Sequence, residues 1–161
     1  MDIKTGFGYD IHRLEKIDNG YFLLAQVKIE GQFKIVAHSD GDIMLHSLSN
    51  AILSALGRED IGFYFPNNVV KTENISSLNI LNFALEEMRS EGYHLSNVVV
   101  DCVLEKPKLL PYREKVKENL SKFLNIDIKN IAFHCNTNEH VDAVGNSEAI
   151  KVFSNILLVK D

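Results

Sequence analysis

The stretch "SDGDIMLHSLSNAILSALG", residues 39–57, predicts an amphipathic helix that begins among polar side chains. Its apolar stripe consists of Leu45, Leu48, Ile52 and Leu56. Ser39 or Asp40 can cap the N-terminus, because side-chain oxygens of these types accept hydrogen bonds from the first free N–H groups. Gly57 is suited to end the helix. We therefore expect this helix to pack with its stripe against the core.

The polar side chains at the start of this helix are candidates for ligand binding. Asp42 and His46 are four residues apart, so they share a face near the N-terminus, where free N–H groups and the helix dipole favour anions. Asp42 either caps the helix or orients His46, and Asp40 is equally suited to capping. His38 lies outside that face. It is either a buried, hydrogen-bonded histidine or a donor to a phosphate near the helix start.

Strands and helices alternate along the rest of the chain. The patterns predict strands at 3–9, 95–105, 128–137 and 148–160, and a pair of short strands over 21–35 that bends at Gly31. Helices are predicted over 77–90 and from Pro111, with a surface loop over 58–74. We expect one α+β domain over residues 1–161, an α/β two-layer sandwich whose mixed sheet carries helices on one face.

Composition narrows the class of protein. The chain has 161 residues, of which 45% are hydrophobic, and 17 basic against 22 acidic side chains give a net charge of −5. This mild acidity does not indicate a nucleic-acid binder, and no signal peptide or membrane span is predicted. The two cysteines, Cys102 and Cys135, lie in apolar runs and are predicted to be buried and reduced. We expect a bacterial cytoplasmic protein, or one of the plastid stroma if a transit peptide has been removed.

A metal site is predicted where the first strand ends. Asp10 and His12 are two residues apart in an extended segment, expected to be a loop after the strand, so they point the same way. A third ligand must come from elsewhere, and His46 is the natural candidate. One aspartate and two histidines suit catalytic zinc, which takes three protein ligands and keeps a fourth position open. The alternative is that these side chains are exposed or serve as caps.

The segment "HCNTNEH", residues 134–140, follows a predicted strand and gathers hydroxyl, amide and carboxylate groups. Thr137 and Glu139 project to one side if the segment stays extended. They could then supply a donor for phosphate and a ligand for a hard cation such as Mg²⁺. The other interpretation is an ordinary polar strand end.

Five motifs in register give the chain a family resemblance: "GYDIH", "AHSDGDIMLH", "DIGFYFP", "EKPKLLP" and "NTNE". Together they closely resemble the 2-C-methyl-D-erythritol 2,4-cyclodiphosphate synthase family of the non-mevalonate isoprenoid pathway. The resemblance implies a homotrimer with its sheets facing the centre and active sites at the subunit interfaces. It also implies conversion of 4-diphosphocytidyl-2-C-methyl-D-erythritol 2-phosphate into the cyclic diphosphate, with release of CMP.

The resemblance also implies roles for individual residues. Zinc would be held by Asp10, His12 and His46, and Mg²⁺ or Mn²⁺ by Glu139. His38 and Thr137 match positions that stabilise the transferred phosphoryl group, and Ser39 supplies a further contact. The cytidine pocket matches residues 104–110, including Leu104, Lys108, Leu109 and Leu110, and the substrate contacts also include Asn136, Thr137 and Glu139. Asp60, Gly62 and the loop from Phe65 match the part that holds the methylerythritol.

The chain departs from the family pattern at two places. Asn67 and Asn68 replace an aspartate-rich continuation, which affects erythritol binding. Ala143 and Asn146 replace an aromatic and an arginine near the central cavity of the trimer, which affects any binding of isoprenoid diphosphates there.

Two other functions use the same residues. A zinc-dependent phosphoester hydrolase would activate water at the Asp-His-His site. A trimeric binding protein with structural zinc would unfold when the metal is removed.

Overall fold

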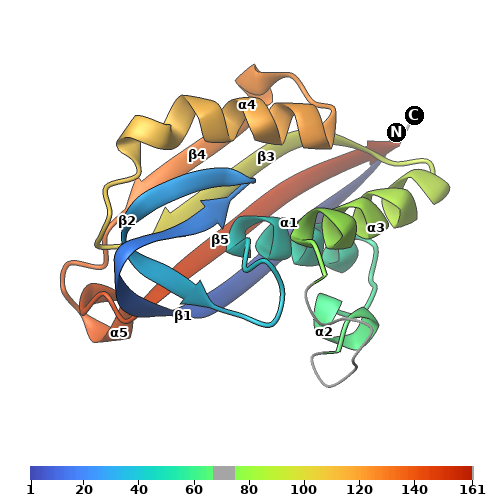
Figure 1. Cartoon of the computed structure of the whole chain (residues 1–161). Helices are drawn as coiled ribbons and strands as arrows, with labels where there is room; N and C mark the ends of the chain where they lie inside the picture. The colour runs from blue at the N-terminus through green and yellow to red at the C-terminus, as the bar shows by residue number, and fades with distance from the viewer. Residues whose placement is uncertain (67–74, 161) are drawn as a thin grey trace.

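The computed structural model describes residues 1–66 and 75–160, so Asn67 and Asn68 lie outside the described residues. Its centre is a five-stranded sheet in the order β2-β1-β5-β3-β4 (Figure 1). The strands are β1 (Asp2–Leu24), β2 (Val27–Val36), β3 (His94–Val103), β4 (Ile131–Asn136) and β5 (Ala149–Lys160). β3 and β4 are parallel, while the other neighbours are antiparallel. The predicted mixed sheet is confirmed.

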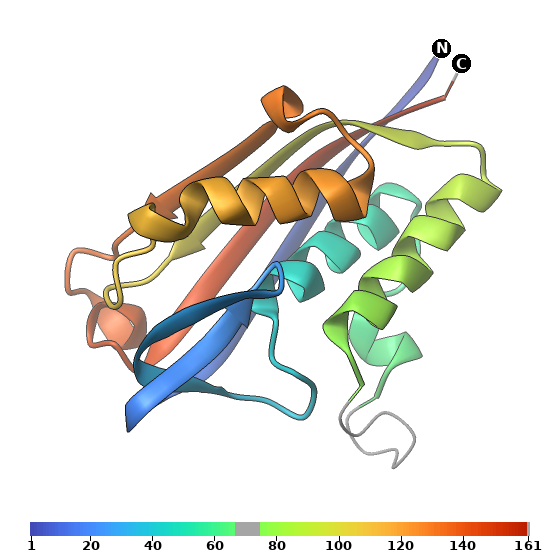
Figure 2. The ribbon, with the colours of Figure 1, turned by 45° about the horizontal axis from the view of Figure 1, so that its top comes forward.

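The helices form a second layer over one face of the sheet (Figure 2). They are α1 (Ile43–Ala55), α2 (Ile61–Tyr64), α3 (Ser77–Ser90) and α4 (Arg113–Leu124), with a short α5 (Asp142–Gly145) before β5. Two 3₁₀ turns cover Leu110–Tyr112 and Ile128–Asn130. The expected α+β architecture with helices on one face is therefore correct. None of the helices in the described part of the chain is long and apolar enough to cross a membrane.

Most of the predicted helix and strand positions match the structure, with local differences. α3 spans the predicted 77–90, while the predicted loop over 58–74 contains the one-turn helix α2. Pro111 lies in a 3₁₀ turn just before α4. Cys102 is buried, Cys135 is half-buried, and both are free thiols on the neighbouring strands β3 and β4. Burial raises the pKa of the Cys102 thiol well above its usual value.

Strand β1 does not end before Asp10, so the predicted ligand-bearing loop is wrong. Asp10 and His12 lie inside the strand and pair with Val152 and Ile150 of β5. The pairing continues because the backbone ladder needs only N–H and C=O groups, whatever the polarity of the side chains. Both ligand-type side chains therefore stand on a rigid strand.

The β1–β2 hairpin turns at Ala25 and Gln26 and not at Gly31, which lies within β2. Both turn residues have left-handed φ angles, 47° and 62°. Their N–H groups donate to the buried carboxylate of Asp42, at 3.0 and 2.7 Å, and this explains how two residues other than glycine hold this conformation. The hairpin is thus tied to the segment that precedes α1.

The same Asp42 carboxylate caps α1 by accepting a hydrogen bond from Leu45 N. Ser39 and Asp40 are therefore not the caps, and the capping interpretation of Asp42 is the correct one of the two considered. The predicted end of the helix is confirmed, since Gly57 follows it with φ +67°.

Helix α1 is buried well beyond its predicted stripe, and of its residues only Asn50 and Ser54 are not buried. Gly6 and Gly8 of β1 allow it to lie directly on the strand: an added Cβ at either would be 1.9 Å from a carbonyl oxygen of α1, that of Ala51 or Ser47. α3 packs against α1 in the helix layer. The helix is therefore central, and its small residues Ser47 and Ser49 are fully buried.

We expect Gly8→Ala to destabilise the protein by about 3 kcal/mol or more, because the new methyl group meets backbone that cannot yield as a side chain would. Urea unfolding measures the loss. Lys16→Ala, at an exposed position of the same strand, is the matched control and should change stability by less than about 1 kcal/mol. Equal unfolding midpoints for the two variants would contradict the close packing of α1 on β1.

Candidate active site

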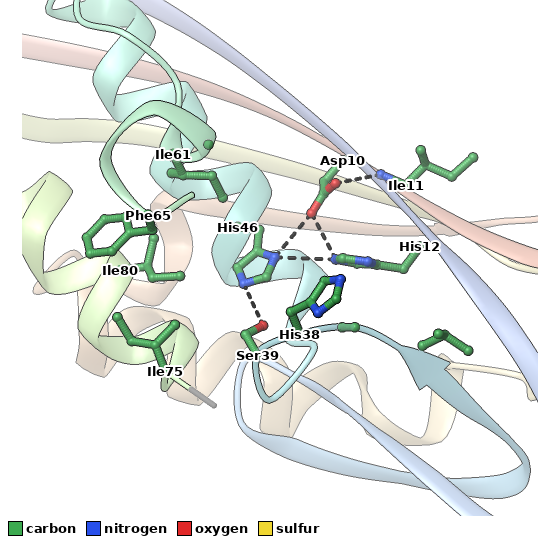
Figure 3. Close-up of a pocket in the computed structure, with 13 residues that line it drawn as sticks. Asp10, Ile11, His12, His38, Ser39, His46, Ile61, Phe65, Ile75 and Ile80 are labelled. Carbon is green, nitrogen blue, oxygen red and sulfur yellow. Dashed lines mark hydrogen bonds and ion pairs between the residues drawn. The ribbon is translucent and has the colours of Figure 1, made fainter. Parts of the chain in front are cut away.

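Asp10, His12 and His46 meet where β1 passes the start of α1 (Figure 3). Asp10 Oδ2 lies 3.1 Å from His12 Nε2 and 3.2 Å from His46 Nδ1. The two ring nitrogens are 3.3 Å apart. The fold therefore brings the predicted trio together from β1 and α1, although His12 and His46 are 34 residues apart in sequence.

The geometry of these three atoms fits a metal ion. Zinc bonds of about 2.0–2.1 Å in a tetrahedron place neighbouring ligand atoms about 3.3 Å apart. The three measured separations lie close to that edge length. Burial alone would raise the pKa of the Asp10 carboxyl, but hydrogen bonds from His12 and His46 lower it to about 2. Asp10 is therefore a carboxylate at neutral pH, and the trio could hold a metal ion.

A cavity of about 350 Å³ opens beside the trio. His38 and Ser39 line it, and so do Gly62 and Phe65, which come from α2 and the residue after it. The exposed His38 faces the cavity, so the interpretation of His38 as buried is wrong. Asp60 caps α2 by accepting a hydrogen bond from Phe63 N at 3.1 Å. The apolar part of the wall consists of Val36, Ala37, Ile61, Phe65, Ile75 and Ile80.

The second ring nitrogen of His46 contacts residues that the sequence did not identify as functional. His46 Nε2 lies 2.8 Å from Ser77 Oγ and 3.3 Å from Ser39 Oγ. Ser77 in turn donates a hydrogen bond to Asp40. Ser77 was visible in the sequence only as the start of a helix, because nothing local indicates that this helix packs against His46.

A smaller cleft, of about 100 Å³, gathers most of the other predicted substrate residues. Its lining consists of Leu104, Lys108, Leu109, Leu110, Cys135, Asn136 and Thr137. Thr137 Oγ1 donates to Glu139 Oε1 at 3.3 Å, so these two side chains do lie together. The segment is not extended, since β4 ends at Asn136 and Glu139 has φ +49°.

The buried carboxylate of Glu105 supports this segment. Its Oε1 accepts hydrogen bonds from Asn138 N at 2.8 Å and His140 N at 3.3 Å. Burial opposes the ionisation of Glu105, but these N–H donors hold the pKa of its carboxyl below the usual value. Sequence patterns gave no sign of this role, because the two segments are more than 30 residues apart.

The two groups of residues lie apart within one chain. In Figure 1, the end of β4 and α5 are at the left, whereas α2, beside the metal-type trio, is at the right. The lining of the larger cavity includes no residue of the smaller cleft. We call these two groups of predicted site residues, which lie apart in one chain, the two partial sites.

The class of this protein is defined by a two-layer α+β sandwich in which an Asp-His-His trio that could hold a metal ion lies at the start of a central helix. The chain belongs to the YgbB family, whose model matches residues 3–159. A relative from Leptospira borgpetersenii, named 2-C-methyl-D-erythritol 2,4-cyclodiphosphate synthase, is 41% identical over 158 residues and covers 98% of both chains. One from Brachyspira hyodysenteriae with the same name is 38% identical and covers 98% of this chain and 99% of its own.

Solved structures agree with these relatives. The IspF of Plasmodium falciparum, solved as a CDP complex, has a TM-score of 0.86 at 36% identity and covers 99% of this chain and 97% of its own. The bifunctional IspDF of Campylobacter jejuni has a TM-score of 0.90 at 34% identity; the match covers 98% of this chain and 42% of that longer one.

The pH dependence of stability tests the role of Glu105. A carboxyl whose pKa is lowered by folding stabilises the folded state fully above its unfolded-state pKa of about 4.3, and this contribution is lost as the pH falls through the folded-state pKa. We therefore expect Glu105→Gln to lower the urea midpoint of unfolding at pH 7. Towards acid pH, the midpoint of this variant should fall less steeply than that of the wild type. Glu114→Gln, at an exposed position on α4, is the control. Parallel pH profiles for wild type and Glu105→Gln would contradict the role.

Proposed function

We propose that this chain is a phosphorus-oxygen lyase of the cyclase type. It converts 4-diphosphocytidyl-2-C-methyl-D-erythritol 2-phosphate into 2-C-methyl-D-erythritol 2,4-cyclodiphosphate and CMP, in the non-mevalonate route to isoprenoid precursors. The observation that carries the proposal is the Asp10, His12 and His46 triangle, with near-tetrahedral edges, in a chain that matches synthases of that name over almost its whole length. The free thiols are consistent with a reducing compartment, and we assign the bacterial cytoplasm or the plastid stroma.

The reaction needs positioning and charge stabilisation more than it needs a protein nucleophile. The 2-phosphate of the substrate attacks the β-phosphorus of the diphosphate, a P–O bond to CMP breaks, and the ring closes. Such transfers are accelerated by holding the reacting groups in line and by placing donors at the oxygens that gain charge. His38 and Ser39 present such donors at the larger cavity, and Thr137 presents one at the smaller cleft.

Two metal ions complete this assignment. Asp10, His12 and His46 would hold Zn²⁺, a Lewis acid that neutralises phosphate charge when it is bound. Glu139 is exposed next to Thr137, and its carboxylate suits Mg²⁺ or Mn²⁺, which prefer oxygen ligands. The zinc trio lines the larger cavity, and Glu139 lies beside Thr137 of the smaller cleft.

The two ends of the substrate, the cytidine and the methylerythritol, are assigned to one partial site each. The smaller cleft takes the cytidine, with the backbone of 104–110 reading the base and Lys108 near the nucleotide. Asn136 also lines this cleft. The methylerythritol lies in the larger cavity near Gly62 and Phe65, and Asp60 keeps acceptor capacity for a sugar hydroxyl beyond its single capping bond.

The proposal requires a homotrimer, because one substrate must touch both partial sites. The sheet face that carries no helices supplies the surface for it. Ile3, Phe7, Tyr9 and Ile11 alternate along β1 on that face and are 41–54% exposed. The rings of Phe7 and Tyr9 approach Phe153 of β5, at 6.3 and 5.2 Å between centroids. An apolar patch of this kind on a small protein favours burial in an interface, here with the sheets facing the centre of the trimer.

Turnover followed by phosphorus NMR, with the diphosphocytidyl substrate, Zn²⁺ and Mg²⁺, tests the activity. We expect CMP and a cyclic diphosphate from the wild type, and at least about 100-fold slower turnover with weakened zinc binding from His46→Ala. Cyclic product from His46→Ala at the wild-type rate would contradict the zinc assignment. CMP with a linear product would favour the hydrolase, and loss of the fold on zinc removal would favour a structural zinc.

Light scattering tests the assembly. Phe7→Glu puts a charge on the apolar sheet face, and we expect it to shift the protein from trimer to monomer, with turnover falling in parallel and the circular dichroism unchanged. Asn82→Glu adds the same charge at an exposed position of α3 and should leave both trimer and turnover intact. A fully active wild-type monomer would contradict the interfacial site.

A further inference from the structure

The ring of His46 lies between two acceptors. Its Nδ1 is 3.2 Å from the Asp10 carboxylate, and its Nε2 is 2.8 Å from Ser77 Oγ. Ser77 is fully buried at the first residue of α3, and its hydroxyl is also bonded to Asp40. A neutral imidazole carries one proton, so only one of the two nitrogens can donate. The nitrogen that keeps a free lone pair is the one that can bind a metal.

The direction of the hydrogen bond between Ser77 and His46 follows from the partners of Asp40. Its carboxylate accepts from Asp42 N at 3.2 Å, Ser77 N at 3.1 Å and the Gln26 side-chain amide at 3.3 Å. These groups are all donors, so Asp40 is an acceptor here, and the Ser77 hydroxyl donates its only proton to it. Ser77 Oγ can then only accept from His46. With a metal ion on Nδ1, the proton of His46 is therefore on Nε2, where Ser77 Oγ accepts it.

We propose that Ser77, held in this direction by Asp40, is a positioning residue that sets the tautomer of His46 for metal binding. In the metal-free protein the Asp10 carboxylate and Ser77 Oγ compete for this proton, and without Ser77 the proton lies on Nδ1, bonded to Asp10, where it blocks the metal. Ser39 Oγ does not replace Ser77, since it is farther from Nε2, at 3.3 Å, and already accepts from Gly41 N. The inference rests on the proposed metal site, and it extends that site from β1 and α1 to α3.

Zinc affinity measured by competition with a chelator tests this without substrate. We expect Ser77→Ala to weaken zinc binding about 10–100-fold, the usual effect of removing the hydrogen-bond partner of a metal ligand. Ser49→Ala is the matched control, because Ser49 is equally buried and donates to Leu45 O, away from the metal site. Equal zinc affinity for Ser77→Ala and wild type would overturn the proposal.

The tautomer itself provides a readout that a merely structural serine would not change. Long-range ¹H–¹⁵N spectra of the metal-free protein, with histidine labelled and the imidazole neutral, should show a larger share of the Nε2–H tautomer of His46 in the wild type than in Ser77→Ala. The same tautomer share in the wild type and the variant would overturn the proposal.

A second variant covers the case in which Ser77→Ala does not fold. Asp40→Asn leaves Ser77 in place but removes the acceptor that fixes its direction, so we expect weaker zinc binding and a smaller share of the Nε2–H tautomer of His46 than in the wild type. Unchanged affinity and tautomer would overturn the proposal. Neither measurement uses turnover, so a failure of the proposed reaction would appear only in the phosphorus assay and would be distinguished from a failure of this inference.

Discussion

The close approach of α1 to β1 at Gly6 and Gly8 is the constraint on which the site depends. Because an added methyl group would meet helix carbonyls at 1.9 Å, the helix can lie on this strand only where there is no side chain. That contact fixes the distance between the strand and the helix, and His46 reaches Asp10 and His12 because of it. Both ligand-bearing elements are held by the packing of the sheet and the helix layer, which favours a metal carried by the scaffold over a site that folds only with its metal.

Asp42 adds a second restraint at the same end of α1. One buried carboxylate satisfies the hairpin turn at Ala25 and Gln26 as well as the helix start at Leu45. Four N–H donors converge on it, counting the side-chain amide of Gln26, and this network offsets part of the cost of burying a charge, while burial still raises the pKa of the Asp42 carboxyl above its usual value. The hairpin, the loop that carries His38 and the helix that carries His46 are therefore held as one unit.

Sequence patterns predicted the architecture and the metal-type trio, because helix caps, apolar periodicity and ligand spacing are local signals. They misplaced the end of β1 and the hairpin turn. The polar Asp10 and His12 suggested a loop, and Gly31 suggested a bend, but pairing with β5 and the distant Asp42 carboxylate determined the structure instead. Ser77 and Glu105 were not found, since their partners lie more than 30 residues away in sequence and only the packing of the elements shows them.

The alternation of side chains along β1 links the site to the assembly. Even-numbered positions face the helix layer and supply Gly6, Gly8, Asp10 and His12, whereas odd-numbered positions supply the apolar face with Ile3, Phe7, Tyr9 and Ile11. A slip of one residue in the pairing with β5 would exchange the two sets: ring side chains would meet α1, and the metal ligands would point away from His46. The register that builds the metal site is thus the same register that presents the proposed trimer face, and neither can form correctly without the other.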